Sequence, residues 1–565
     1  MQLMNAANES FEKVASYGLM PNMIIYLMSD YKMNVGNAQN LLYFWTAALN
    51  FLPILGAFLA DSFAGRFLTI GIGSIISLSV YIMGMLVLWM TTVLPQAKPP
   101  PCDPSTNSCQ SPTAGQYALL IAAFTLMSIG AGGVRTCSQA FGADQIDRRD
   151  NPKNKRVLES FFNWYYACGC LSVVIALTVI VYIQDHFGWR IGFGIPVVLM
   201  FLSSLSFLLA SRLYVNVEVK NSLFLSLAHA IVAAFKNRKT SLSIQGSNVL
   251  YYQRRDSFPS VVPSDSLRFL NKACIIRDSE DIGPDGLARN PWTLCTVEDV
   301  EGLKSLLRII PIWSSSIMMS VGFGSFPVLL AKTMDRHVGA KFEIPAASFG
   351  TFLVIVIVIW IPIYDRVLLP LASKICRRPV RLSVKLRMGI GLVFLFLSLL
   401  SAGIVEHVRR QRAVSEGFEN NPQGVIHMSA MWTVPQYIFG GLAEAFNGIG
   451  QNEFYYSELP KNMSSIATSL SGLGFAVGSL IASLILNVVN DVTRKGGKEG
   501  WIASNVNRGR YDYYYWLLAI LSFLNVVYYV FCSWVYGPLL EHKEVKEDEL
   551  AMLRNTNGHE KEITT

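Results

Sequence analysis

Two acids and a lysine lie close together near the start of the chain. Glu9, Glu12 and Lys13 stand in the stretch NESFEKVASYG, at the head of an apolar run that continues to residue 28. Residues at i, i+3 and i+4 share one helix face, so the three charges can point together into a water-filled cavity. Two carboxylates that approach each other repel, which favours holding a proton on one of them, and the lysine ammonium opposes this effect. The pattern predicts a proton-dependent switch between ion pairs, with a charged helix start among the headgroups as the plainer alternative.

Arg135 and Glu444 are charged residues inside apolar segments. Arg135 stands in GGVRTC, and Glu444 stands in GGLAEAFNG, where its neighbours are small or apolar. A charge in the hydrocarbon is costly, so an intramembrane ionisable residue faces the bundle interior and is a functional candidate by default. Both are therefore candidates for a substrate or proton site, and the alternative for Arg135 is a side chain that snorkels from a helix end.

A membrane-embedded helix bundle is needed to position these charges. Of the 565 residues, 52% are hydrophobic and only 15% are charged, whereas soluble proteins carry about 25% charged residues. We therefore expect an all-α integral membrane protein. A helix needs roughly 20 apolar residues to span the hydrocarbon. Twelve segments meet this requirement, and they lie near residues 6–29, 39–60, 68–93, 115–137, 158–183, 190–211, 302–330, 345–364, 387–405, 427–450, 464–489 and 512–537.

The twelve segments form two groups of six, separated by a polar stretch rich in Ser and charge. This layout suggests a transporter of two similar halves with the substrate site at their interface. In the first half, the loops expected inside carry six Lys or Arg residues and the outside loops carry three, which favours cytosolic termini. The expected division is a six-helix bundle over 1–211, a cytosolic linker over 212–301, a second six-helix bundle over 302–540 and a cytosolic tail over 541–565.

Short cytosolic turns with paired charges recur in the two halves. GAFLADSFAGRF joins the second and third segments and contains Asp61 and Arg66, while YDRVLLP in the second half contains Asp365 and Arg366. An Asp and an Arg can pair across helix ends, so we interpret these residues as turns that close the cytosolic side. Glu453 lies near the cytosolic end of the tenth segment and is interpreted as a gate or loop contact.

Two modifications are suggested by the sequence, one at the start of the third apolar segment and one in a loop. Thr69 follows Arg66 by three residues, a spacing that suits a basophilic kinase, although a helix-start hydroxyl that caps its own backbone is the stronger interpretation. Cys102 and Cys109 share the short outside loop PPPCDPSTNSCQSP, where a disulfide is expected in an oxidising compartment. The nine Cys residues show no metal-ligand spacing, so no metal site is predicted.

A series of motifs along the chain resembles one transporter family. In order they are NESFEK, GAFLADSFAGRFLTI, GAGGVRTCSQAFGADQID, FFNWYY, LRFLNKACI, WTLCTVEDVEGLKSLLRIIPIW, MDRHVGAKFEIPAAS, YDRVLLP, WTVPQYIFGGLAEAF and GQNEFYYSELP. Over residues 5 to 540 the chain resembles the plant nitrate transporter 1/peptide transporter family. That family is the plant branch of the proton-dependent oligopeptide transporters within the major facilitator superfamily. The resemblance implies twelve transmembrane helices in two six-helix bundles, alternating access, and proton-driven uptake of a small polar solute.

The resemblance gives the opening motif a role in proton coupling. The family's E-x-x-E-[RK] motif on the first helix corresponds to Glu9, Glu12 and Lys13. Many relatives carry Arg at the position of Lys13, and Lys lacks the planar guanidinium fork that clamps a carboxylate. Tyr17 follows at the spacing where relatives place a tyrosine of the cavity. In the fifth helix the family often has Asn at or near Gly169, so a polar substrate contact is not expected there.

The resemblance also implies substrate roles for Arg135 and Glu444. Arg135 matches a cationic position that faces the helix-one motif, so we expect it to alternate between Glu9 or Glu12 and an anionic substrate group. Glu444 matches a position that lines the cavity and contacts substrate. The seventh helix, SSSIMMSVGFGSFPVLL, lacks the His that some nitrate-transporting relatives place there. Its closely spaced glycines and proline predict a break or bend.

We therefore interpret the chain as a proton-coupled symporter of a small anion. Nitrate is the leading substrate, because the branch that shares EKVASYGL and YLMSDY contains nitrate transporters. Di- and tripeptides, organic acids and plant hormones are the alternatives, and an anion sensor or scaffold without transport is the alternative from another class. No enzymatic site, cofactor or nucleic-acid partner is predicted. The net charge is +8, and the basic segments flank membrane helices, where lipid headgroups are their ordinary partner. The expected location is the plasma membrane, and no oligomeric state is predicted.

Overall fold

The structure of the chain is a computed structural model. The chain divides into two compact units. The first comprises Met1–Val219, Ser316–Gly450 and Gly472–Val526. The second comprises Lys220–Ser315, Gln451–Ser471 and Val527–Thr565. The described residues are 2–59, 74–100, 110–144, 168–210, 223–239, 250–253, 262–277, 281–283, 286–322, 324, 326–339, 342–377, 382–460, 463–495 and 499–537. Within them, eight helices are long and apolar enough to span a membrane.

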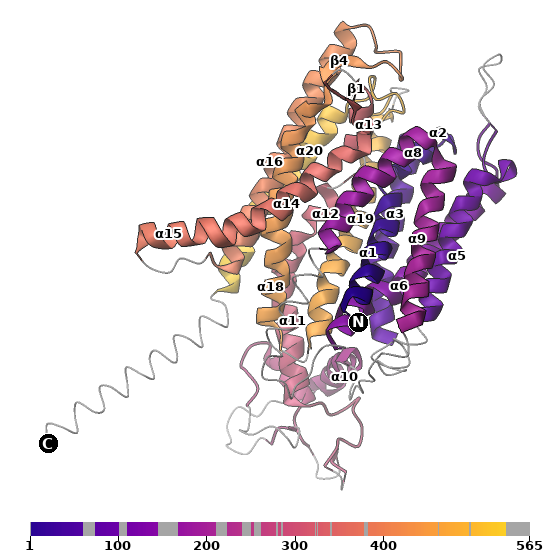
Figure 1. Cartoon of the computed structure of the whole chain (residues 1–565). Coiled ribbons are helices and arrows are strands. Elements are labelled where there is room, and N and C mark those ends of the chain that lie inside the picture. Colours follow the sequence, from indigo (N-terminus) through magenta and orange to yellow (C-terminus); the bar gives the residue numbers. More distant parts are fainter. Residues whose placement is uncertain are drawn as a thin grey trace. The chain divides into compact units, whose positions relative to one another are not determined.

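The helices of the first half pack along one another, as Figure 1 shows for α1, α3, α5, α6 and α9. Their bounds are α1 Gln2–Leu19, α2 Met23–Ser29, α3 Val35–Leu59, α5 Ser74–Val93, η3 Pro95–Ala97, α6 Ala114–Asp144, η4 Ala176–Ile180, α8 Val181–Phe187 and α9 Trp189–Ala210. The chain bends between α1 and α2 at Pro21, where a helix cannot continue its hydrogen bonds. The Gln184 side chain supports this bend by donating to the Gly18 carbonyl at 2.8 Å.

Glycines bring α6 against its neighbours. A β-carbon at Gly130 would lie 2.5 Å from the Tyr81 backbone nitrogen in α5, and one at Gly56 in α3 would lie 2.5 Å from the Gly132 carbonyl oxygen in α6. Small residues permit such close contact between helix backbones in membranes. The GAGG stretch that precedes Arg135 is therefore the surface by which α6 packs against α3 and α5.

We predict that Gly130→Ala destabilises the protein by about 1–3 kcal/mol or more, because the new methyl group must push apart two backbones. Gly115→Ala is the matched control: it lies in the same helix, and nothing stands within 4 Å of its added β-carbon. The control should be neutral or slightly stabilising through helix propensity. Thermal melting in detergent separates the two, and equal melting temperatures would contradict the predicted clash.

The second half begins with a broken helix. Its segments α11 Val297–Ser316, α12 Met318–Gly322 and α13 Phe326–Lys332 replace one continuous span, and Gly324 lies between the last two. The predicted break in the seventh helix is therefore confirmed. The remaining elements are β1 Met334–Asp335, β2 His337–Val338, β3 Phe342–Glu343, η9 Ala346–Gly350, α14 Thr351–Ile363, η10 Tyr364–Leu368, α15 Leu369–Cys376, α16 Val384–Ser415, β4 Ile426–Ser429, η11 Ala430–Thr433, α17 Val434–Ala443, η12 Glu444–Gly448, α18 Ile449–Glu458, α19 Ser464–Thr493 and α20 Tyr511–Tyr536.

Short strands connect the helix ends of the second half. β1 pairs with β4 in parallel, and β2 pairs with β3 antiparallel. Three of the helical segments, η4, η10 and η12, are π-helical turns within longer helices. Such turns are frequent at functional sites, and two of the three contain residues predicted from the sequence: η10 holds Asp365 and Arg366, and η12 begins at Glu444.

The linker between the halves contains the helix α10, Leu223–Lys236, followed by η6, Asn237–Lys239, and η7, Arg268–Ala273. All three belong to the second compact unit, together with most of α11.

Candidate functional site

Glu12 is a buried carboxylate near the middle of α1. Only 8% of its surface is exposed, and its Oε1 accepts a hydrogen bond from the Ser16 hydroxyl at 2.8 Å. The Ser16 oxygen is also 2.9 Å from the hydroxyl of Tyr81 in α5. Serine has one hydroxyl proton and directs it at Glu12, so Tyr81 is the donor in the second bond. A short chain of hydroxyl groups thus connects the acid of the opening motif to a second helix.

The packing of α6 places the backbone of Arg135 near the level of Glu12. Gly130 contacts the backbone of Tyr81, and Arg135 follows five residues later, about 7.5 Å along the helix axis. Successive helices of the bundle run in opposite directions, so residues after Gly130 lie toward the same end as residues before Ser16. Glu12 precedes Ser16 by about 6 Å along α1. The side chain of Arg135 itself lies outside the described residues.

Lys13 occupies space that Gly169 leaves open. A β-carbon at Gly169 would lie only 2.7 Å from the Lys13 ammonium nitrogen, so the absence of a side chain makes room for the lysine head. This packing gives a physical reason for the departure from Asn that the sequence shows here. The other predicted residues of α1 are Glu9, whose side chain lies outside the described residues, and Tyr17, which is 43% exposed.

Glu444 begins the π-helical turn η12 and is half-buried. A β-carbon at Gly448 would lie 2.6 Å from its carboxylate oxygen, so Gly448 leaves room for this carboxylate on its own helix. The turn is held against α16 by Asn447, which donates to the Met388 carbonyl at 2.9 Å and is fully buried. On the side of α14, Phe446 packs against the ring of Trp360. Packing on two sides thus holds the turn that carries Glu444.

Polar contacts join the two predicted halves at the helix ends farther from the N-terminus. Asn40 in α3 donates to the Asn487 side-chain oxygen in α19 at 2.6 Å, and the Ser483 hydroxyl donates to the Asn40 oxygen at 2.7 Å. A β-carbon at Gly324, in the break of the seventh helix, would lie 2.9 Å from the Tyr43 hydroxyl. These contacts connect helices of the two halves at this end, and none of them was predicted from the sequence.

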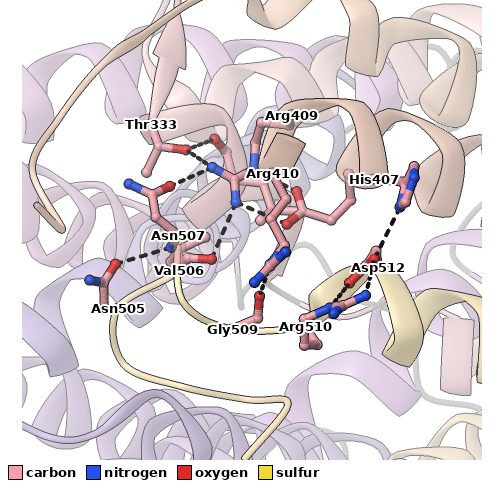
Figure 2. Close-up of polar contacts among 12 residues, drawn as sticks. Thr333, His407, Arg409, Arg410, Asn505, Val506, Asn507, Gly509, Arg510 and Asp512 are labelled. Atoms are coloured by element: carbon pink, nitrogen blue, oxygen red, sulfur yellow. Dashed lines mark hydrogen bonds and ion pairs between the residues drawn. The ribbon is translucent and has the colours of Figure 1, made fainter. Parts of the chain in front are cut away.

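Arg409 is the centre of a buried polar network that the sequence reasoning missed (Figure 2). Its guanidinium donates to both carboxylate oxygens of Glu406, at 2.6 and 2.9 Å, and both side chains are buried. It also donates to Thr333 at 3.0 Å, to the Asn507 side chain at 2.7 Å and to the Val506 carbonyl at 3.2 Å. The network therefore binds α16 to the turn before β1 and to the loop before α20.

The network was missed because the ninth span was predicted to end at residue 405. The structure extends α16 to Ser415, so that prediction of the boundary is wrong. Buried hydrogen bonds offset the cost of placing these charges in the helix. The available signal was the i, i+3 spacing of Glu406 and Arg409 directly after an apolar run.

A second group of charges lies beside this network. Asp512 is buried and accepts from Arg510 at 3.1 Å, and it also meets His407 at 3.2 Å. At the end of α16, the backbone amide and imidazole of His427 lower the pKa of the Glu416 carboxyl below its usual range. These pairs add hydrogen bonds that connect α16 to β4 and to the start of α20.

We predict that Arg409→Met destabilises the protein by about 3–5 kcal/mol, because Glu406 would remain buried without its partner. Replacing both residues, as Glu406→Leu with Arg409→Met, should recover much of the loss, since no buried charge then remains. Arg412→Met is the control, because Arg412 is exposed on the same helix. Thermal melting of the purified protein measures all three, and a single variant as stable as the control would refute the prediction.

The remaining predicted residues are not brought into this site by the described contacts. Asp365 and Arg366 are exposed in η10, and Glu453 is exposed in α18 within the second unit. Among the residues that the structure describes, no three His, Cys, Asp or Glu side chains are placed to hold a metal ion. The predictions that lie outside the described residues concern Asp61, Arg66, Thr69, Cys102 and Cys109.

Known proteins with the same architecture are membrane transporters. A sequence model of the POT family, PTR2, matches residues 67–502. The Arabidopsis thaliana proteins NRT1/PTR family 1.2 and 1.1 are each 55% identical to the chain, over 98% and 97% of the chain and 93% of each relative. The crystal structure of the POT family transporter PepTSo has a TM-score of 0.67 at 18% identity, covering 95% of this chain and 98% of that chain. A POT family transporter in complex with 5-aminolevulinic acid has a TM-score of 0.60 at 13% identity, covering 95% and 96%. These similarities confirm the predicted major-facilitator fold and the prediction of a transporter in place of an enzyme.

Proposed function

Since the chain belongs to the POT family of transporters, where its close relatives are plant NRT1/PTR proteins, we propose that it carries a small anion together with protons. Nitrate is the leading candidate for the anion. The observation that carries the proposal is the buried Glu12, linked through Ser16 to Tyr81 and followed directly by the cation Lys13. A carboxylate in this position can take up a proton and change its bonding partners, which couples protonation to helix movement.

The proposed coupling acts between α1, α5 and α6. When Glu12 is ionised, it accepts the Ser16 hydroxyl and attracts nearby cations. Protonation removes the negative charge and makes one carboxyl oxygen a donor, so Glu12 holds those cations less strongly. A cation that Glu12 releases becomes available to an anion in the cavity. Arg135 on α6 and Lys13 on α1 are the proposed cations.

Transport in this proposal requires the closed end of the bundle to open. The bonds of Asn40 to Asn487 and Ser483 join helices of different halves, and such bonds can exchange for bonds to water with little net change in free energy. The break at Gly324, against the Tyr43 hydroxyl, gives the seventh helix a point where it can flex. We propose that these contacts form the outer gate.

A second candidate substrate is a zwitterion or organic acid. A solved POT family transporter binds 5-aminolevulinic acid, which has an amine and a carboxylate. In this chain, Glu444 would hold an amine and Arg135 a carboxylate. The acid in η12 supports this second candidate, because an amine would give Glu444 a positive group to bind and nitrate has none.

The test is a substrate panel in oocytes that express the full chain, with membrane current recorded at acidic and neutral pH. Nitrate, di- and tripeptides, organic acids and plant hormones are applied in turn. An inward current that a substrate elicits and that grows at acidic pH supports symport and identifies the substrate. Binding of an anion without current or uptake would identify a sensor, and no response to any compound would refute an anion symporter.

The proposed location is the plasma membrane, with both termini and the linker in the cytosol. The plasma membrane is the default location, and the basis for the orientation is the excess of basic residues in the loops assigned to the inside of the first half. Protease protection of terminal epitope tags on intact cells tests this orientation.

A further inference from the structure

The linker helix α10 is apolar over most of its surface. Its sequence, LFLSLAHAIVAAFK, contains one Ser, one His and a terminal Lys among fourteen residues. One side packs into a core with the motifs LRFLNKACI and WTLCTV, which the proposed function does not use. The members of that core are Ala230, Ala233, Ala234, Leu270, Ala273, Cys274, Cys295, Val297, Val300 and Leu303. This packing accounts for only one side of the helix.

The opposite side of α10 presents large apolar side chains to the surroundings. Ile231 is 54% exposed and Phe235 is 66% exposed, and the two lie one turn apart on one face. Leu225, near the start of the helix, is also exposed. A helix that is hydrophobic all round is normally buried on all sides. The exposed face of α10 therefore requires an apolar partner.

Basic groups border this exposed apolar face. Lys236 and Arg238 are both exposed, and the Arg238 guanidinium lies 4.2 Å from the centre of the Phe235 ring. The stretch from Leu223 to Lys239 contains three basic residues and no acidic residue. Exposed apolar side chains with adjacent Lys and Arg are the pattern of helices that lie in the interface of an anionic membrane.

The folded linker holds α10 in a defined position. The Asn237 side chain donates to the carbonyls of Lys272 and Thr293, both at 2.9 Å, and it is buried. The Lys272 ammonium in turn donates to the Arg238 carbonyl at 2.7 Å. Because these bonds cap the end of α10, its outer face has a fixed direction with respect to the start of α11.

α10 lies beside the part of α11 that precedes a marker of the membrane interface. Val297, Val300 and Leu303 of α11 pack in the α10 core, and Arg308 follows Leu303 by five residues, about 7.5 Å along the axis. Arg308 stacks on Tyr536 at the end of α20, where Trp534 is 78% exposed. Trp and Tyr at helix ends mark the membrane interface. The headgroup layer is about 5–7.5 Å thick on each side. The part of α10 at the level of Leu303, beside the first turns of α11 (Figure 1), therefore borders the outer edge of this layer.

We propose that the outer face of α10 docks on the anionic leaflet that faces the linker. Ile231 and Phe235 insert among the lipid headgroups, and Lys236 and Arg238 bind lipid phosphates and carboxylates. The linker is then a membrane-bound module that holds the start of α11 at a constant depth. This inference depends on the bilayer position and not on the transported substrate.

Photo-cross-linking of the full chain in nanodiscs tests the docking. Phe235 is replaced by p-benzoylphenylalanine, and the nanodiscs contain phosphatidylcholine with or without phosphatidylserine. We expect phospholipid adducts on the α10 peptide, with a higher yield when phosphatidylserine is present. Leu287 is the matched control position, because it is 62% exposed in the same unit but belongs to a loop and not to α10. The control should give little or no lipid adduct, and the melting temperature checks that each variant is folded.

Removal of the basic groups tests the electrostatic contribution to membrane docking. The double variant Lys236→Gln with Arg238→Gln carries the cross-linker at 235. It should weaken docking by about 30-fold, because each basic residue near an anionic surface contributes about 1 kcal/mol and two are removed. An unchanged adduct yield in this variant would overturn the role of the charges. A covalent dimer, an adduct to another part of the chain, or lipid adducts equal at 235 and 287 would overturn the docking itself. None of these readouts depends on uptake, so the result is independent of the proposed symport.

Discussion

A Glu12→Gln variant is expected to lose acid-driven uptake while it continues to exchange substrate across the membrane. Glu12 is buried, and a glutamine of the same shape still bonds to Ser16 but cannot take up a proton. A gradient of about two pH units supplies about 2.7 kcal/mol for each coupled proton, or about 100-fold accumulation. The variant should lose this factor, so its uptake should be the same at acidic and neutral pH.

The experiment uses proteoliposomes that contain the purified chain. Net uptake with an inward proton gradient measures coupling, and counterflow without a gradient measures the carrier movement that remains. Glu419→Gln is the control, because Glu419 is exposed in a loop, and it should retain both activities. Ser16→Ala keeps the acid but removes its link to Tyr81, so we expect an intermediate pH dependence. Full pH-dependent uptake by Glu12→Gln would eliminate this residue as the coupling site.

Arg135→Ala should remove the uptake of an anionic substrate. A charged hydrogen bond to a bound anion contributes about 2–5 kcal/mol when one partner is truncated, which corresponds to at least about 30-fold in affinity. Arg135→Lys should retain part of the activity, because a positive charge remains although the planar fork is lost. The α6 backbone places this residue near the level of Glu12 on α1, where a cation can serve either the carboxylate or the substrate.

Substrate binding and uptake are both measured for the two Arg135 variants. Arg412→Ala is the control, because Arg412 is exposed near the end of α16 and should change neither quantity. Equal losses in Arg135→Ala and Arg135→Lys would assign a structural or bidentate role instead of a point charge. Normal binding and uptake in both variants would remove Arg135 from the substrate site.

The broken seventh helix and the long ninth helix show how far local sequence patterns reach. Gly322, Gly324 and Pro327 lie within six residues of one another, and their effect on a helix is local, so the break was predictable. The end of α16 was not predictable in the same way. Apolar periodicity stops near residue 405, yet the helix continues to Ser415, because distant groups satisfy the charges of Glu406 and Arg409.

The glycines of α6 show the same distinction within the coupling site. GAGG in the sequence indicates a place for close helix contact, but it does not say which helix approaches. In the structure, Gly130 meets Tyr81 on α5, and Tyr81 then reaches Ser16 and Glu12 on α1. The choice of neighbour depends on how the whole bundle packs.

The sequence by itself determined the membrane class, the approximate spans of most helices and the charged positions of α1, because hydrophobic transfer and helix periodicity act through neighbours along the chain. Only the tertiary structure decided which distant groups the buried polar side chains contact. Ser16 bonds to a residue 65 positions away and Arg409 to one 98 positions away. It also decided that α10, apolar throughout its sequence, buries one face and leaves the other exposed. Contacts over such separations arise from side-chain packing between helices, and no local pattern specifies which helices will meet.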